Sequence, residues 1–137
     1  MKYMKPLLIS IALVLLFSCR KETTSTNTNT ITITLDSCSS QATDTQNFQI
    51  CFDSLLEESR CPANANCIWQ GAAKAKFRFK INGQEHVLRL STLSMAPSYT
   101  NDTTVAGFHF KLINILPYPV YPNNPTGQVT AIVEVTQ

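Results

Sequence analysis

A nine-residue segment near the middle of the chain alternates apolar and cationic side chains without a break. Residues 73–81 read AKAKFRFKI, so the apolar positions and the four cations would fall on opposite faces of an extended strand. Asn82-Gly83 follows directly, and this dipeptide favours the two-residue turn of a β-hairpin because both turn positions need positive φ. The segment therefore predicts a β-hairpin in the middle of the chain, with its apolar face packed on a core.

The alternation also predicts the register of this hairpin. We expect a return strand over residues 84–90, with Lys80 opposite Glu85 and Phe77 opposite Leu88. The polar face then carries a row of basic side chains, here called the basic stripe, and the negative charge of Glu85 neutralises only part of its positive charge. The cations of the stripe are Lys74, Lys76, Arg78, Lys80 and Arg89. A solvated sheet face is one interpretation, and a face that meets an anionic glycan or lipid headgroup is another.

Four further segments alternate in the same way and predict strands. They are residues 30–35, 47–52, 108–116 and 129–135. No segment keeps a 3.6-residue period over ten residues, and residues 53–59 would make one helical turn at most. We therefore predict an all-β fold, an antiparallel β-sandwich or small open barrel of six to seven strands, in a single domain over residues 30–137.

The N-terminus has the pattern of an export signal. Lys2 and Lys5 precede residues 7–17, which are apolar except for Ser10. A run of this length matches the hydrophobic region of a secretory signal, and it falls short of the about 20 residues that a membrane-spanning helix needs. Residues 1–18 are therefore predicted to be a signal peptide.

Leu16-Phe17-Ser18-Cys19 resembles the bacterial lipobox, in which a small residue precedes an invariant cysteine. The resemblance implies cleavage before Cys19 and a diacylglyceryl group on its sulfur, which would anchor the protein to a membrane. Residues 19–29 would then be the lipidated cysteine and a flexible polar tether. Arg20-Lys21-Glu22 resembles the start of Bacteroidetes lipoproteins, which implies the outer membrane, on its periplasmic side or at the cell surface. An ordinary signal peptide with an incidental cysteine is the alternative.

Loss of the signal would change the charge of the chain. The whole sequence has 11 basic and 9 acidic residues, and the predicted signal contains two of the basic ones, Lys2 and Lys5, and none of the acidic ones. The mature chain would be formally neutral. We therefore predict no nucleic-acid partner.

Four cysteines remain in the body of the chain, and an even number in an exported domain predicts two disulfides. Of the three possible pairings we favour Cys61–Cys67, which closes a short loop, together with Cys38–Cys51, which would join neighbouring strands. A zinc site made of all four is the alternative. The C-x₅-C and C-x₁₂-C spacings lie outside the usual C-x₂₋₄-C, so we predict neither metal nor cofactor.

The most distinctive motif surrounds the second cysteine pair. Residues 58–62 read ESRCP, and residues 67–73 read CIWQGAA. The motif resembles that of a family of small bacterial lipoproteins and secreted domains, whose signature runs D-S-R-C-P and then C-x-W-x-G-x-A before an alternating strand. Glu58 stands where that family has Asp. The resemblance carries no assigned activity.

The motif has a structural and a functional interpretation. In the structural one, Trp69 buries its ring at the entrance of the next strand, Gly71 allows a close backbone approach, and Arg60 forks onto carbonyl groups or onto Glu57 or Glu58. In the functional one, a rigid, solvent-facing turn docks into a partner. The candidate binding residues of that loop are Arg60, Pro62 and Trp69.

Groups for catalysis are few, and we predict no catalytic residues. His86 and His109 are isolated in predicted strands, and the sequence contains no G-x-S-x-G or H-E-x-x-H motif. An enzyme with a composite site of Asp53, Glu57 and His109 is the least favoured hypothesis. Two triplets, 53–55 and 102–104, resemble short O-glycosylation sites, with Thr103 in a polar loop as the candidate.

The sequence thus favours a non-enzymatic lipoprotein of the cell envelope, anchored through Cys19. It would act as a structural or binding module, with another envelope protein or a glycan as partner. The alternative is an inhibitor of a protease or a wall-lytic hydrolase that presents residues 60–67 to the active-site cleft, where a pre-organised loop reduces the entropy cost of binding.

Overall fold

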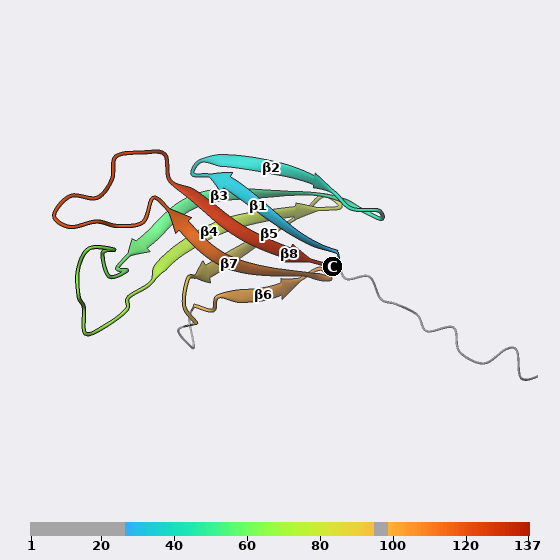
Figure 1. Ribbon diagram of the computed structural model, residues 1–137. Coiled ribbons are helices and arrows are strands. Elements are labelled where there is room, and N and C mark those ends of the chain that lie inside the picture. The colour runs from blue at the N-terminus through green and yellow to red at the C-terminus, as the bar shows by residue number, and fades with distance from the viewer. Residues whose placement is uncertain (1–26, 95–98) are drawn as a thin grey trace, which may run out of the picture.

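The strands of this protein build two antiparallel sheets, as the alternating segments predict (Figure 1). The computed structural model describes residues 27–94 and 99–137. Eight strands lie in these ranges, in the order β1 (Thr28–Thr34), β2 (Ser37–Ala42), β3 (Asn47–Glu58), β4 (Ala73–Ile81), β5 (Gln84–Ser91), β6 (Asp102–Val105), β7 (Phe108–Leu116) and β8 (Thr130–Thr136). The first sheet has the order β1-β8-β7-β6 and the second the order β2-β3-β4-β5. The predicted all-β sandwich is confirmed, with eight strands instead of six or seven.

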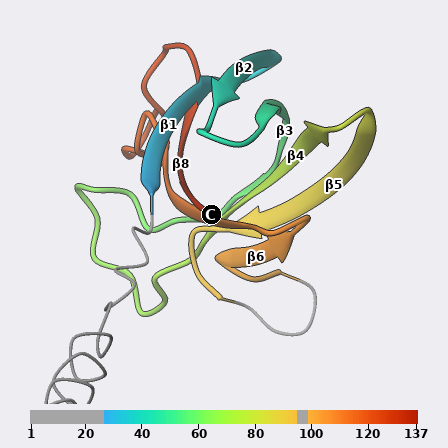
Figure 2. The same ribbon diagram turned by 90° about the vertical axis from the view of Figure 1, so that its right-hand side faces the viewer.

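The core lies between the two sheets, which Figure 2 shows from the end of the sandwich that carries the C-terminus. Its largest fully buried side chains are phenylalanines from both sheets, Phe52, Phe77, Phe79, Phe108 and Phe110. The rings of Phe79 and Phe110 cross the interface edge to face, with centroids 4.7 Å apart. Aromatic pairs in this geometry contribute about 0.5–1.5 kcal/mol beyond the burial of their area.

The β4–β5 hairpin has the predicted turn and register. Lys80 pairs with Glu85 and Phe77 with Leu88. Asn82 has φ 50° and Gly83 has φ 76°, the positive values that a two-residue hairpin turn requires.

Two edge strands do not show in the sequence pattern. β2 reads SCSSQA, which has no apolar face, and its residues alternate between half-buried and exposed. β6 contains Thr103, which we expected to lie in a polar loop. It pairs with β7, and it places Thr103 opposite Phe110 and half-buried, so the predicted loop position of Thr103 is wrong.

β3 is longer than expected and extends through the segment predicted to make a helical turn. Its pairing with β4 shifts register twice, between Phe52 and Ser54 and between Leu55 and Glu57. Each β-bulge adds a residue to one strand and breaks the two-residue period, so the alternation disappears from the sequence although the strand continues. The other triplet that resembles a glycosylation site, residues 53–55, therefore also lies within a strand.

The β domain begins slightly before its predicted boundary, because β1 starts at Thr28. The predicted signal peptide, Cys19 and most of the 19–29 tether lie outside the described residues. Within the described part of the chain, no helix has the length and apolar character that a membrane crossing needs.

The sandwich has two ends with different contents (Figure 1). One end, here called the proximal end, carries the start of β1, the end of β8 and the tight turn of the β4–β5 hairpin. The other, the distal end, carries the long connections 59–72 and 117–129. The chain therefore enters the domain at the end opposite to these two loops.

Candidate functional site

The loop 59–72 begins as a continuation of the β3–β4 ladder. The amide of Ser59 donates to the carbonyl of Ala72 at 3.0 Å, and the amide of Cys61 donates to that of Gln70 at 2.9 Å. Beyond these bonds the Cys61–Cys67 disulfide closes the tip. The other disulfide joins Cys38 and Cys51, which are directly opposed on β2 and β3. Both favoured pairings are confirmed, and the four-cysteine zinc site is wrong because its ligands are used in disulfides.

Gly71 provides the close backbone approach that the motif predicts. Its φ is +66°, and a Cβ at this position would lie 1.7 Å from the carbonyl oxygen of Ser59. Only a residue without a side chain fits here. Gly71 therefore allows the base of the loop to close against β3.

Arg60 points into the protein and is only 6% exposed. Its guanidinium donates to Oε1 of Glu58 at 2.8 Å, to Oδ1 of Asn114 at 2.8 Å and to the carbonyl of Ile115 at 2.7 Å. It also lies 4.4 Å from the centre of the Tyr118 ring. The predicted fork onto Glu58 and a carbonyl is confirmed. The interpretation of Arg60 as a solvent-facing docking residue is wrong, because its donors are satisfied by partners on β3 and β7.

A second set of contacts fastens this loop to residues 117–129. The amide of Ala63 donates to the carbonyl of Pro119 at 2.9 Å. The side chain of Asn64 makes two bonds with the backbone of Tyr121, one donated and one accepted, both 2.8 Å long. Two loops that are far apart in the sequence therefore form one body at the distal end.

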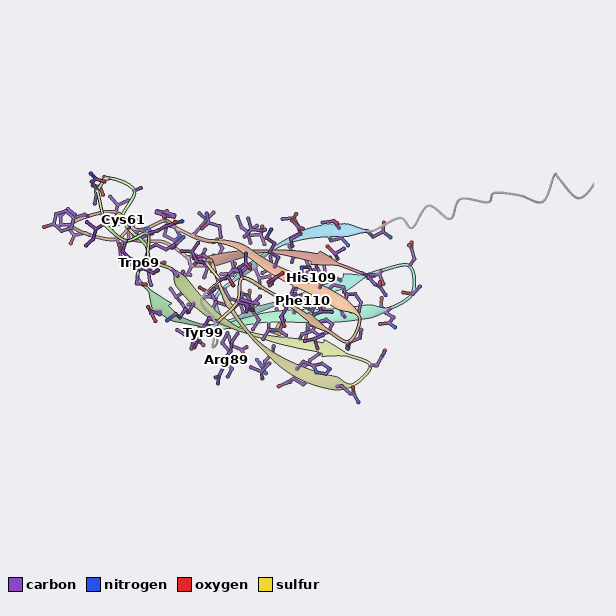
Figure 3. The ribbon with its side chains drawn as sticks, turned by 90° about the horizontal axis from the view of Figure 1, so that it is seen from below. Cys61, Trp69, Arg89, Tyr99, His109 and Phe110 are labelled. Atoms are coloured by element: carbon purple, nitrogen blue, oxygen red, sulfur yellow. A yellow bond between two sulfur atoms is a disulfide. The ribbon has the colours of Figure 1, made fainter. Side chains whose placement is uncertain are left out.

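The tip of this body is exposed and uncharged, and large apolar side chains stand there among Asn and Gln residues. Trp69 is 58% exposed, Ile68 is fully exposed, and Tyr121 projects from the neighbouring loop. Figure 3 shows Trp69 together with Cys61 at the distal end. No Asp, Glu, Lys or Arg occurs in residues 61–73 or 115–129. We call Ile68, Trp69, Tyr118 and Tyr121, with the amides beside them, the distal surface.

The three predicted binding residues thus have different surroundings. Arg60 lies inside, and Pro62 is half-buried where its carbonyl accepts from the amide of Ala65 at 3.0 Å. Trp69 lies outside, so the predicted burial of its ring is wrong. The ladder ends at Cys61 and Gln70, and the following residues 63–70 have no sheet to pack against. Tyr118 and Tyr121 are not among the predicted binding residues, although Pro117-Tyr118-Pro119 also resembles the family of the motif and the segment 117–127 contains four prolines.

The composite catalytic site is not assembled. Asp53 accepts from Arg78, and Glu57 from Lys74, on the outer face of the second sheet. His109 lies on β7 of the first sheet, with Nε2 3.5 Å from Asp102 and Nδ1 3.1 Å from the hydroxyl of Thr104. This Thr–His–Asp row was also missed. Its residues are on the outward side of an edge strand pair, away from the hollow between β2, β3 and the β4–β5 turn.

His86 differs from its expected solvated position. It opposes Phe79 on the core side of the β4–β5 hairpin, and the two rings lie 6.1 Å apart. Its Nε2 is buried and has no hydrogen-bond partner within residues 27–94 and 99–137. The alternation in β5 predicts that His86 lies on the same face as Leu88 and Leu90. It does not predict that the Nε2 atom is buried.

The basic stripe lies on the outer face of the second sheet, and three of its cations have acidic partners. Lys74 bonds Glu57 at 2.6 Å, Arg78 bonds Asp53 at 2.7 Å, and Lys80 lies 3.1 Å from Glu85. The hydrogen bond from Lys74, with a further one from Ser59, lowers the pKa of Glu57 below its usual value. The hydrogen bond to Asp53 and its charge raise the pKa of Arg78.

Comparison of the chain with family models, with curated proteins and with solved structures found no match. The function is therefore argued from the residues of this chain, above all from the distal surface.

Proposed function

We propose that this protein is a non-enzymatic lipoprotein of the cell envelope that docks another envelope protein through its distal surface. The lipid on Cys19 would hold it in the outer membrane, on the periplasmic side or at the cell surface. One observation carries the proposal: two loops bonded into one body expose Trp69 and Ile68 on segments that contain no charged residue.

The composition of the distal surface favours a protein partner. The centres of protein interfaces are enriched in Trp and Tyr and depleted of charged residues, and hot spots are well packed in desolvated pockets. Ile68 is fully exposed, and a branched aliphatic side chain gains most when a protein pocket encloses it. A glycan offers no such pocket.

The orientation of the domain supports the same conclusion. The described chain starts at the proximal end, so a tether in the preceding residues would put the membrane on that side. The distal surface would then face away from the anchor. Its two loops are already joined by hydrogen bonds. Binding of a partner therefore needs little further ordering of the backbone and costs little conformational entropy.

A hydrolase inhibitor is the second candidate, and the disulfide-closed tip favours it. Residues 63–70 are all exposed and project beyond the β3–β4 ladder. Such a loop can enter an active-site cleft without being ordered first. The docking residues would be residues 64–69, since Arg60 is committed to Glu58 and Asn114.

A capture experiment from native envelope extract tests the proposal. The bait is the oxidised full-length chain, compared with a distal variant that combines Ile68→Ser and Trp69→Ser. Val87→Ser is the matched control, because Val87 is 54% exposed on β5 and is remote from the two loops in the sheet. We expect the same partner with the wild type and with Val87→Ser, and its loss with the distal variant.

Three results decide between the alternatives. A partner held equally by all three baits overturns the role of the distal surface. A captured hydrolase whose turnover falls on adding the wild-type chain, and is unaffected by the distal variant, selects the inhibitor. Native protein without a lipid-sized mass increment on Cys19 overturns the lipoprotein assignment.

A further inference from the structure

The basic residues of this domain are gathered on one surface. The described ranges contain seven Lys and Arg residues, and five of them lie on the outer face of β4 and β5. Of the other two, Arg60 is buried and Lys111 lies on the first sheet. Asp53, Glu57 and Glu85 are the acids paired with this face, so an excess of two positive charges remains there.

That excess falls on one cross-strand pair. Lys76 and Arg89 are directly opposed on β4 and β5. Neither makes an ion pair with any residue in 27–94 or 99–137, whereas Lys74 and Arg78 on either side along β4 are both paired. Like charges that oppose each other across a sheet destabilise it. The fold therefore tolerates a repulsion that an anion placed between the two side chains would remove.

We propose that Lys76 and Arg89 bind the phosphate group of a soluble phosphate monoester, with Ser54 as a third contact. Such a phosphate carries about −1.5 to −2 charges at neutral pH, which matches the excess on the pair. The guanidinium presents two parallel donors to phosphate oxygens, and the ammonium adds a point charge. Ser54 pairs with Lys76 from β3, which places a hydroxyl in the same row on the same face.

A single phosphate group fits this surface better than a membrane does. Lipid-binding patches use about four to eight cations, each contributing about 1 kcal/mol near an anionic bilayer. Here two cations are unpaired, and Asp53, Glu57 and Glu85 flank them. An extended anionic surface would meet these carboxylates as well. This proposal is independent of the distal surface.

Thermal unfolding of the full-length chain in dodecyl maltoside tests the site, with inorganic phosphate as the probe and chloride at equal ionic strength as reference. Phosphate at ten times its Kd should raise the wild-type Tm by about 5 °C. Lys76→Gln and Arg89→Gln should be at least as stable as the wild type in chloride, because they remove the repulsion, and should lose the phosphate shift. Lys111→Gln, which removes one cation from the other sheet, should keep it.

Three outcomes would overturn the proposal. An equal phosphate shift in all variants shows an adventitious ion only. A fall in the chloride Tm of both stripe variants shows that the pair is structural. A shift that depends on Lys76 and Arg89 but follows phosphatidylglycerol added to the micelles, and not inorganic phosphate, replaces the soluble ligand by a lipid surface.

Discussion

Gly71 lies so close to Ser59 that no other amino acid fits at this position, since a Cβ would be 1.7 Å from the Ser59 carbonyl oxygen. Gly71→Ala should therefore cost about 3 kcal/mol or more of unfolding free energy, because a positive φ costs a side chain about 1–2 kcal/mol and a backbone clash is added to it. Gly83→Ala is the control, because Gly83 also has positive φ but nothing within 4 Å of a Cβ. Urea unfolding measures both, and equal losses would contradict the clash.

Arg60 should behave as an interior residue. Arg60→Ala leaves Glu58 and Asn114 without their donor, and breaking a buried ion pair from one side costs about 3–5 kcal/mol. Because Glu58 keeps some contact with water, we expect the lower part of that range. Denaturant titration against Arg89→Ala, an exposed arginine expected to change stability by less than about 0.5 kcal/mol, provides the comparison. Similar small effects for the two variants would place Arg60 at the surface after all.

Trp69 should contribute little to stability. Trp69→Ala is expected to cost less than about 2 kcal/mol because more than half of the residue is exposed. Phe79→Ala, at a fully buried position, should cost about 3–5 kcal/mol. Chemical unfolding of both variants checks the contrast. A loss of several kcal/mol for Trp69→Ala would mean that the ring belongs to the core.

The two disulfides should contribute unequally. In the chain-entropy account, the Cys38–Cys51 pair, with a separation of 13 residues, stabilises by about 3 kcal/mol, and the Cys61–Cys67 pair, with a separation of 6, by about 2 kcal/mol. Paired Cys→Ser variants measured by urea unfolding give the two values. The reverse order would show that the short loop is held chiefly through its native contacts.

The carboxyl group of Glu57 should titrate below its usual range. Its pKa is lowered by Lys74 and Ser59, so the stabilisation from this pair is present above the unfolded-state pKa and is lost as the pH falls through the folded-state pKa. Lys74→Gln should move the NMR titration midpoint of Glu57 upward. Lys76→Gln, with no ion pair to Glu57, should leave it nearly unchanged, and equal shifts in both variants would argue for a general field effect.

Alternation was sufficient to predict the centre of this fold. Lys80 and Glu85 occupy the expected rung because a two-residue turn at Asn82-Gly83 leaves only one register. β2 gave no such signal, since an edge strand of Ser, Cys and Gln needs no apolar face. The second half of β3 is not predicted as a strand, because two bulges remove the two-residue period that identifies one.

The motif was harder to interpret than the strands, because its partners are remote in the sequence. Arg60 is buried because Asn114 accepts a hydrogen bond from its guanidinium and the Tyr118 ring lies against it. Both residues are more than 50 positions away in the sequence, so no local pattern predicts these contacts. The structural interpretation places the Trp69 ring inside because burying a large aromatic ring is favourable, whereas the docking interpretation places it in an exposed loop. Burial statistics do not anticipate a loop that extends past the end of the sheets.

The pairing of β1 with β8 has a mechanical consequence. The two strands are paired from Thr28 with Thr136 to Thr34 with Thr130, and β1 enters at the proximal end. A pull between the start of the chain and a body held on the distal loops acts along β1, whereas ladder bonds lie across the strands. The whole ladder is then strained in shear, and its bonds must break together instead of opening one after another. The strand that joins the domain to its N-terminal segment is thus oriented to resist force.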